Sequence, residues 1–270
     1  ITRIVRRTRK YLEDTVNPAT GEPYLQKIAV ELLGEGNEDA IRLPAYLRGA
    51  YEKAEEIAKE LGQKNSGFIT TMILRRVGSS MYAGKTTAEK MLGNANKPEE
   101  LASSLLEDES FDDDEESTPK KALEVTEGAK SALRGFIDIL TDNLESDPKY
   151  LKLEQLLLNE GWARKGCIIF SQYYDTVWWL AEKMVRSGKF ADQKIAIYAG
   201  GDKSGMFIDG EFVRRPKEDL KRMVKTGELK VIFGTDAASE GLNLQTLGTL
   251  INIDLPWNPT RLEQRKGRIQ

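Results

Sequence analysis

The chain has 270 residues, of which 40% are hydrophobic, so it can bury a substantial core in one or two domains. It has no histidine and a single cysteine, Cys167, which excludes Ser–His and Cys–His catalytic pairs, a Cys/His zinc site and an internal disulfide. The net charge of the chain is −3, but residues 107–116 contain eight acids and no basic residue. The other residues therefore carry a net charge of −3 + 8 = +5, which mildly favours a polyanionic partner.

Residues 1–145 are predicted to form a mostly helical extension or protrusion. Apolar residues recur at helical spacing within residues 46–61, and a second amphipathic helix opens at Phe68. Residues 94–120, which contain the acidic tract, are predicted to be a disordered linker because like charges repel and resist burial. DNA mimicry and metal binding are the alternatives for this tract, although it lacks the spaced ligands and central glycine of a calcium loop.

Residues 146–270 are predicted to form an α/β domain, because short β-branched runs alternate there with helical patterns. Asp147 and Pro148 are typical of the N-cap and first residue of a helix. The sequence predicts strands at 166–170, 194–199, 229–234 and 249–253, and intervening helices at 175–187 and 216–226. This alternation implies a parallel sheet flanked by helices, with ligands at the carboxyl ends of the strands.

Small polar residues follow the first two predicted strands. Ser171 and Gln172 end the first strand, where a hydroxyl and a helix N-terminus can hold a phosphate; Ser171 can equally serve as a helix cap. Gly200 and Gly201 follow the second strand and permit close approach of a phosphate, or simply form a flexible loop. All four residues are candidates for binding a nucleic-acid backbone.

The segment at residues 234–245 is the most informative, because a strand here passes into small and polar residues. The hydroxyl and amide of Thr235 can hold a phosphate oxygen, and Asp236 can accept from a ribose hydroxyl or position an arginine. Gly241 permits a tight turn, and Asn243 can brace the loop. This segment is therefore a candidate site for both nucleotide and nucleic acid.

The last predicted helix starts at Asn258 and Pro259 and carries a stripe of arginines. Arg261, Arg265 and Arg268 recur at i, i+4 and i+7, and Gln264 shares a face with Arg268. Such a stripe is usually solvated, but here it falls at the predicted carboxyl-end rim of the sheet. Trp257, just before the helix, can simply pack.

Residues 78–86 are similar to an ATP-binding P-loop but are rejected as one. The run has one residue too many between its glycines, and the preceding residues are helical in character, whereas the pattern requires a strand.

Residues 235–245 and 264–268 resemble the two signature segments of the second motor lobe of superfamily-2 helicases, of the Swi/Snf type and with a bacterial character. The resemblance implies a RecA-like lobe that provides Arg268 and Arg265 as catalytic arginines to ATP. Gln264, Asp236 and Gly241 would face the nucleotide. Ser171, Gln172, Gly200, Gly201, Thr235 and Asn243 would contact nucleic acid.

The resemblance also implies partners. ATP and Mg²⁺ would be bound mainly by a first lobe of the same polypeptide, and the chain would be a fragment truncated within its last motif. Double-stranded DNA would be the track. An RNA or single-strand helicase lobe and a non-catalytic nucleic-acid-binding module are the alternatives. No apolar run approaches the roughly 18 residues of a membrane span, so no membrane contact is expected. No metal site of its own is expected either, because the chain has no histidine and one cysteine. The expected location is cytoplasmic, and nucleoid-associated if the protein is bacterial.

Overall fold

The computed structural model describes residues 11, 14–24, 40–61, 66–95, 125–236, 246–256 and 258–267. The chain divides into two compact units, residues 1–40 and 41–270. In the first unit, an antiparallel bridge joins Val16 and Pro23 around a turn. The turn is held by Asn17, whose Oδ1 accepts from the N–H of Ala19 at 2.9 Å. The predicted boundary between residues 145 and 146 stays a prediction.

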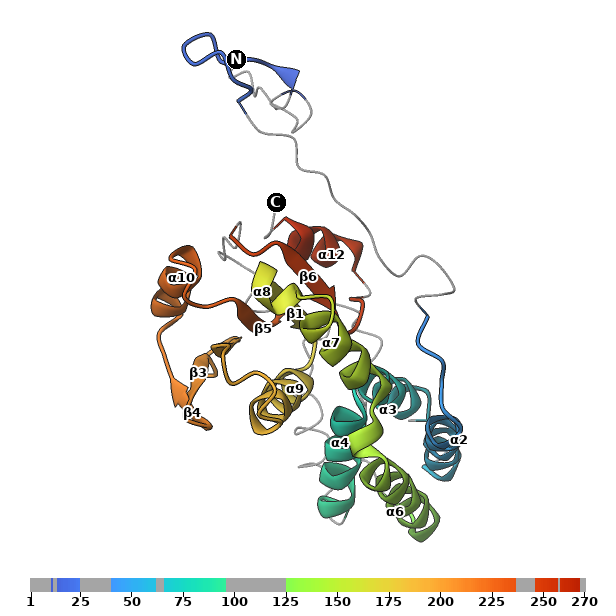
Figure 1. Ribbon diagram of the computed structural model, residues 1–270. Helices are drawn as coiled ribbons and strands as arrows, with labels where there is room; N and C mark the ends of the chain where they lie inside the picture. Colours follow the sequence, from blue (N-terminus) through green and yellow to red (C-terminus); the bar gives the residue numbers. More distant parts are fainter. Residues whose placement is uncertain are drawn as a thin grey trace. The chain divides into compact units, whose positions relative to one another are not determined.

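Helices open the second unit, and among its described residues before 143 there are four (Figure 1). They are α2 (Ala45–Glu60), α3 (Ser66–Ser79), α4 (Met81–Gly93) and α6 (Glu127–Asp142). Their apolar faces share one core, which includes Ile57, Met72 and Phe136. The two helices that the apolar spacing predicts, over residues 46–61 and from Phe68 onward, are present as α2 and α3, while the assignment of residues 1–145 as one helical part stays a prediction. The acidic tract lies outside the described residues.

A mixed six-stranded sheet forms the centre of the second half of the chain (Figure 1). Its strands are β1 (Cys167–Ser171), β2 (Ile195–Tyr198), β3 (Gly205–Ile208), β4 (Glu211–Arg214), β5 (Val231–Thr235) and β6 (Thr249–Asn252). The order is β4-β3-β2-β5-β1-β6, and β2, β5, β1 and β6 are parallel. These four are the predicted strands, displaced by at most two residues at either end.

Helices cover both faces of this sheet. They are α7 (Pro148–Leu158), α8 (Trp162–Lys165), α9 (Tyr174–Arg186) and α10 (Lys217–Lys225), preceded by a 3₁₀ turn, η3 (Leu144–Ser146). Cys167 and Ile169 of β1 pack with α7 and α9, whereas Ile168 and Phe170 pack with α10. Burial on both faces explains the nearly continuous apolar character of the strands. The α/β class is confirmed, and no helix in the described part of the chain could cross a membrane.

An antiparallel hairpin, β3–β4, is the main addition to the prediction. It pairs with β2 at the edge of the sheet opposite β6. Its two-residue turn is Asp209-Gly210, and both residues have positive φ, 51° and 84°. Asp-Gly between apolar runs is a strong local hairpin signal, so this element could have been predicted.

Cys167 provides a simple test of the fold. Its side chain is completely buried, and burial raises the pKa of the thiol to about 12. In the unfolded chain the pKa of a thiol is about 8.5. Between this pH and the folded pKa, the unfolded state binds fewer protons than the folded state, so the free energy of unfolding falls as the pH rises. At about pH 8.5 we expect iodoacetamide to modify the denatured chain readily and the native chain very slowly. Rapid native modification, read by mass spectrometry, would contradict the buried position.

Candidate functional site

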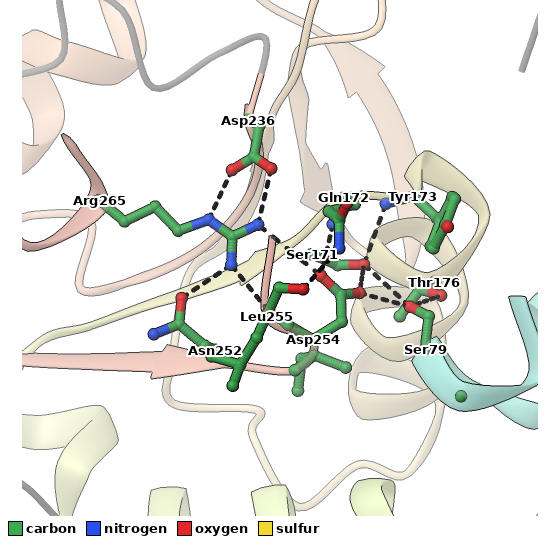
Figure 2. Close-up of polar contacts among 12 residues, drawn as sticks. Ser79, Ser171, Gln172, Tyr173, Thr176, Asp236, Asn252, Asp254, Leu255 and Arg265 are labelled. Atoms are coloured by element: carbon green, nitrogen blue, oxygen red, sulfur yellow. Dashed lines mark hydrogen bonds and ion pairs between the residues drawn. The ribbon is translucent and has the colours of Figure 1, made fainter. Parts of the chain in front are cut away.

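Arg265 is the central residue of the site, at the carboxyl-end rim of the sheet. It lies in the last turn of α12 (Pro259–Lys266), which starts as predicted: the side chain of Asn258 accepts from the N–H of Thr260 at 2.9 Å. The Arg265 side chain is fully buried. Its Nε and Nη2 donate to the two carboxylate oxygens of Asp236 at 2.5 and 2.8 Å (Figure 2). This bidentate pair is the strongest type of charged hydrogen bond.

Nη1 of Arg265 binds two groups at the end of β6 and just after it. Nη1 donates to Oδ1 of Asn252 at 2.8 Å and to the carbonyl oxygen of Asp254 at 2.9 Å. The guanidinium carbon lies 5.4 Å from the ring centroid of Phe170, and this ring has room because position 234 is glycine; a Cβ there would lie 3.1 Å from it. Four of the five N–H donors are therefore committed inside the protein.

Asp254 connects this arginine to the first strand. Its Oδ2 accepts from the hydroxyls of Ser171 and Ser79, each at 2.6 Å, and its Oδ1 accepts from the N–H of Gln172 at 2.8 Å (Figure 2). Its Oδ1 also lies 3.7 Å from Nη2 of Arg265. One carboxylate thus holds together the ends of β1 and β6 and the end of α3.

The helical region reaches the site through hydroxyl groups. Ser79 and Ser80, at the α3–α4 junction, each lie 2.8 Å from the hydroxyl of Thr176 in α9. Ser80 caps α4 by accepting a hydrogen bond from the N–H of Ala83. Residues 78–86 therefore join two helices, whereas a P-loop joins a strand to a helix, so the rejection of a P-loop agrees with the structure.

Lys149 closes the same junction from α7. Its ammonium group donates to the carbonyl oxygens of Gly78 and Ile253. Burial lowers the pKa of Lys149, an effect that Asp254 and Asp147 oppose. Asp147 itself caps α7, as predicted, and also accepts from the N–H of Met81 at 2.9 Å. The helices and the sheet are therefore joined by buried polar contacts as well as by apolar packing.

The structure brings some of the predicted site residues together. Asp236 and Arg265 are in direct contact, Thr235 is the buried last residue of β5, and Ser171 and Gln172 meet at Asp254. Gly200 and Gly201 follow β2 at the same edge of the sheet, and Gln264 is exposed on α12. Ser171 is completely buried, with its hydroxyl already bonded. Gly241, Asn243 and Arg268 lie outside the described residues.

Sequence reasoning missed three members of the site, Asp254, Asn252 and Ser79. Asp254 follows β6 as Asp236 follows β5, so the rule that strand ends carry the site could have found it. Asn252 sits within a strand, and Ser79 lies 175 positions from its partner Asp254; neither has a local signal.

Charged and hydroxyl side chains gather at the carboxyl ends of β1, β5 and β6, which is the edge at which open α/β sheets usually bind ligands. Residues 148–270 match the family described as helicase conserved C-terminal domain. Asp236 and Arg265, one from each of the two segments that resemble helicase signatures, lie within the matched residues and contact each other.

Several known proteins resemble parts of the chain. "Uncharacterized ATP-dependent helicase YqhH" of Bacillus subtilis is 32% identical over 56% of this chain and 25% of its own length. "ATP-dependent RNA helicase RhlB" of Pseudomonas syringae is 24% identical over 49% of this chain and 31% of its own length. The Pyrococcus furiosus Hef helicase domain is 17% identical over 84% of this chain and 50% of that chain, with a TM-score of 0.45. The chain spans a third or less of these curated relatives.

Proposed function

We propose that the chain is the second, RecA-like motor lobe of an ATP-dependent translocase or helicase of the Swi/Snf type that tracks double-stranded DNA. The observation that carries this proposal is the buried Arg265–Asp236 pair, because it joins the two signature segments at one rim. A lobe of this kind contributes to the ATP site from one side and grips a nucleic-acid backbone with neighbouring loops.

Within this proposal Arg265 is a positioning residue. Its donors are committed to Asp236, Asn252 and Asp254, so the geometry supports a role in seating α12 in preference to direct contact with ATP. Gln264, exposed on the same helix, and Arg268 would then face the nucleotide. Arg268 would stabilise charge on the transferring phosphoryl group, as arginine fingers do.

ATP and Mg²⁺ would be bound mainly by a first lobe of the same polypeptide. Among the described residues, no group of three acids or cysteines could hold a metal ion, and Asp236 and Asp254 are already bonded within the protein. This lobe would therefore supply donors and backbone contacts. The metal would supply charge neutralisation to the triphosphate. A cytoplasmic, nucleoid-associated location belongs to the same proposal.

Nucleic acid would run along the loops after the parallel strands. Gln172, Gly200, Gly201 and Thr235 lie at this edge, and opening and closing of the two lobes on hydrolysis would step them along the backbone. Contacts of this kind are independent of base sequence and sensitive to salt. Ser171, with its bonded hydroxyl, would contribute by fixing the Gln172 backbone.

An RNA helicase lobe is the second candidate function, favoured by the similarity to the protein named RNA helicase RhlB. A steady-state ATPase assay of the full-length protein separates the two. We expect duplex DNA to stimulate turnover well above the level with no nucleic acid. Stimulation by single-stranded RNA alone would replace the proposal with the RNA function. No hydrolysis under any condition would favour a passive binding module.

A further inference from the structure

The β3–β4 hairpin presents separated charges. Its register places Arg214 opposite Gly205 and Glu211 opposite Ile208, so the cations of the hairpin lie at its open end and its acids at the turn. Three residues of strand separate the two ends by roughly 10 Å. Asp209 and Glu211 are therefore too far along the hairpin to neutralise the cations at the open end.

The open end lies at the functional rim of the sheet. Gly205 of β3 pairs with Ile197 of β2, next to the carboxyl end of that strand and the Gly200-Gly201 turn. Lys203, Arg214 and Arg215 are exposed here, and among the described residues none of the three forms an ion pair. Asp202 is the acid adjacent to Lys203. Nearby acids of α10 are already paired: Glu218 with Lys221 at 2.7 Å and Asp219 with Arg222 at 3.0 Å.

An aromatic cluster fixes the hairpin onto α9. The ring of Phe212 lies 4.8 Å from that of Trp178 and 5.3 Å from that of Phe207, both at edge-to-face angles. Gly205 permits this packing, because a Cβ there would lie 2.6 Å from the Phe212 ring. The hairpin is therefore a rigid support for its cations, and binding a ligand there would cost little ordering of the backbone.

The cations adjoin the predicted nucleic-acid path. The ammonium group of Lys203 lies 4.9 Å from the ring centroid of Tyr174. Burial raises the pKa of Tyr174, and the positive charge of Arg214 opposes this effect. Tyr174 is the first residue of α9, two positions after Gln172. The cations of the hairpin thus lie beside the start of α9, close in sequence to Gln172 at the end of β1. The acid in the first turn of α9, Asp175, lies within ion-pair distance of Arg76 and Lys90. Exposed lysine and arginine side chains at this rim suit the phosphates of a nucleic-acid backbone.

We propose that Lys203, Arg214 and Arg215 form an additional site for the phosphodiester backbone of duplex DNA, extending the rim beyond β2. The site rests on the proposed function, because it deepens the track of the same lobe. It contributes to nucleic-acid affinity and takes no part in hydrolysis.

The test compares the full-length protein with the triple variant Lys203→Gln, Arg214→Gln and Arg215→Gln. Binding to a fluorescent DNA duplex is measured by anisotropy between about 50 and 200 mM salt. Loss of three phosphate contacts reduces the salt slope by about 2.7, so the fall in affinity across this range should be roughly 40-fold smaller than in the wild type. ATPase without nucleic acid should be unchanged.

A matched control neutralises three exposed lysines toward the opposite, amino-terminal edge of the sheet, Lys189, Lys194 and Lys225, by substitution with glutamine. It should keep the wild-type slope. An unchanged slope in the hairpin variant, or loss of binding to single-stranded RNA alone, overturns the hairpin site. If the wild type neither binds nor responds to nucleic acid, the proposed function itself fails. Equal thermal midpoints show that the variants are folded.

Discussion

Replacing Asp236 with alanine is expected to lower the free energy of unfolding by about 3–5 kcal/mol, because the substitution leaves the buried Arg265 charge without its partner. Arg265 is completely buried, and two of its hydrogen bonds go to this carboxylate. Urea denaturation followed by circular dichroism measures the loss. The expected effect is large compared with most single substitutions.

The double variant Asp236→Ala, Arg265→Met separates charge from packing. Removing both charges should restore much of the lost stability, since a buried pair is often worth little relative to apolar residues of similar volume. ATPase should remain low in the double variant if Arg265 positions α12. As a control, Glu218→Ala breaks an exposed pair with Lys221 and should change stability by less than about 1 kcal/mol. If the Asp236→Ala protein were as stable as the wild type, the Arg265–Asp236 pair would not hold α12 in place, and the positioning role of Arg265 would be refuted.

The meeting of Asp236 and Arg265 could be expected from sequence for a physical reason. Parallel strands deliver their carboxyl ends to one edge, so a residue just after β5 and a helix just after β6 must lie close together. The place of Asp236 directly after a strand is consistent with the predicted role of positioning an arginine. Strand existence was likewise predictable, because buried parallel strands are continuous apolar runs.

The orientation of Arg265 could not be predicted. The i, i+4, i+7 stripe indicates a shared helix face, but it does not say whether that face meets solvent or protein. Burial of a guanidinium requires acceptors from Asp236, Asn252 and Asp254, which come from other segments. The Ser79–Asp254 contact could not be predicted either, because it depends on how the helices pack against the sheet. A single hydroxyl residue also gives no periodic pattern in the sequence from which such a contact could be inferred.

Replacing Arg268 with alanine in the full-length protein should reduce ATP turnover by about 10³-fold or more while leaving DNA affinity within a few-fold of the wild type. An arginine finger acts mainly in the transition state, when charge develops on the transferring phosphoryl group. The loss should therefore appear in kcat, with little change in KM. Single-turnover hydrolysis and anisotropy with duplex DNA measure the two quantities separately.

Lys266→Ala is the matched control for this substitution. Lys266 is the last residue of α12, is partly exposed and pairs with Glu263 at 3.1 Å. Its removal therefore takes away one positive charge and leaves the contacts of Arg265 with Asp236, Asn252 and Asp254 in place. It should keep ATPase close to the wild type. The Arg265 contacts that hold α12 are intact in both variants. If turnover falls in Arg268→Ala and not in Lys266→Ala, the loss comes from the action of Arg268 on ATP and is not a general effect of removing a positive charge. Near-normal turnover in Arg268→Ala would refute the finger and leave the rim as a passive phosphate-binding surface.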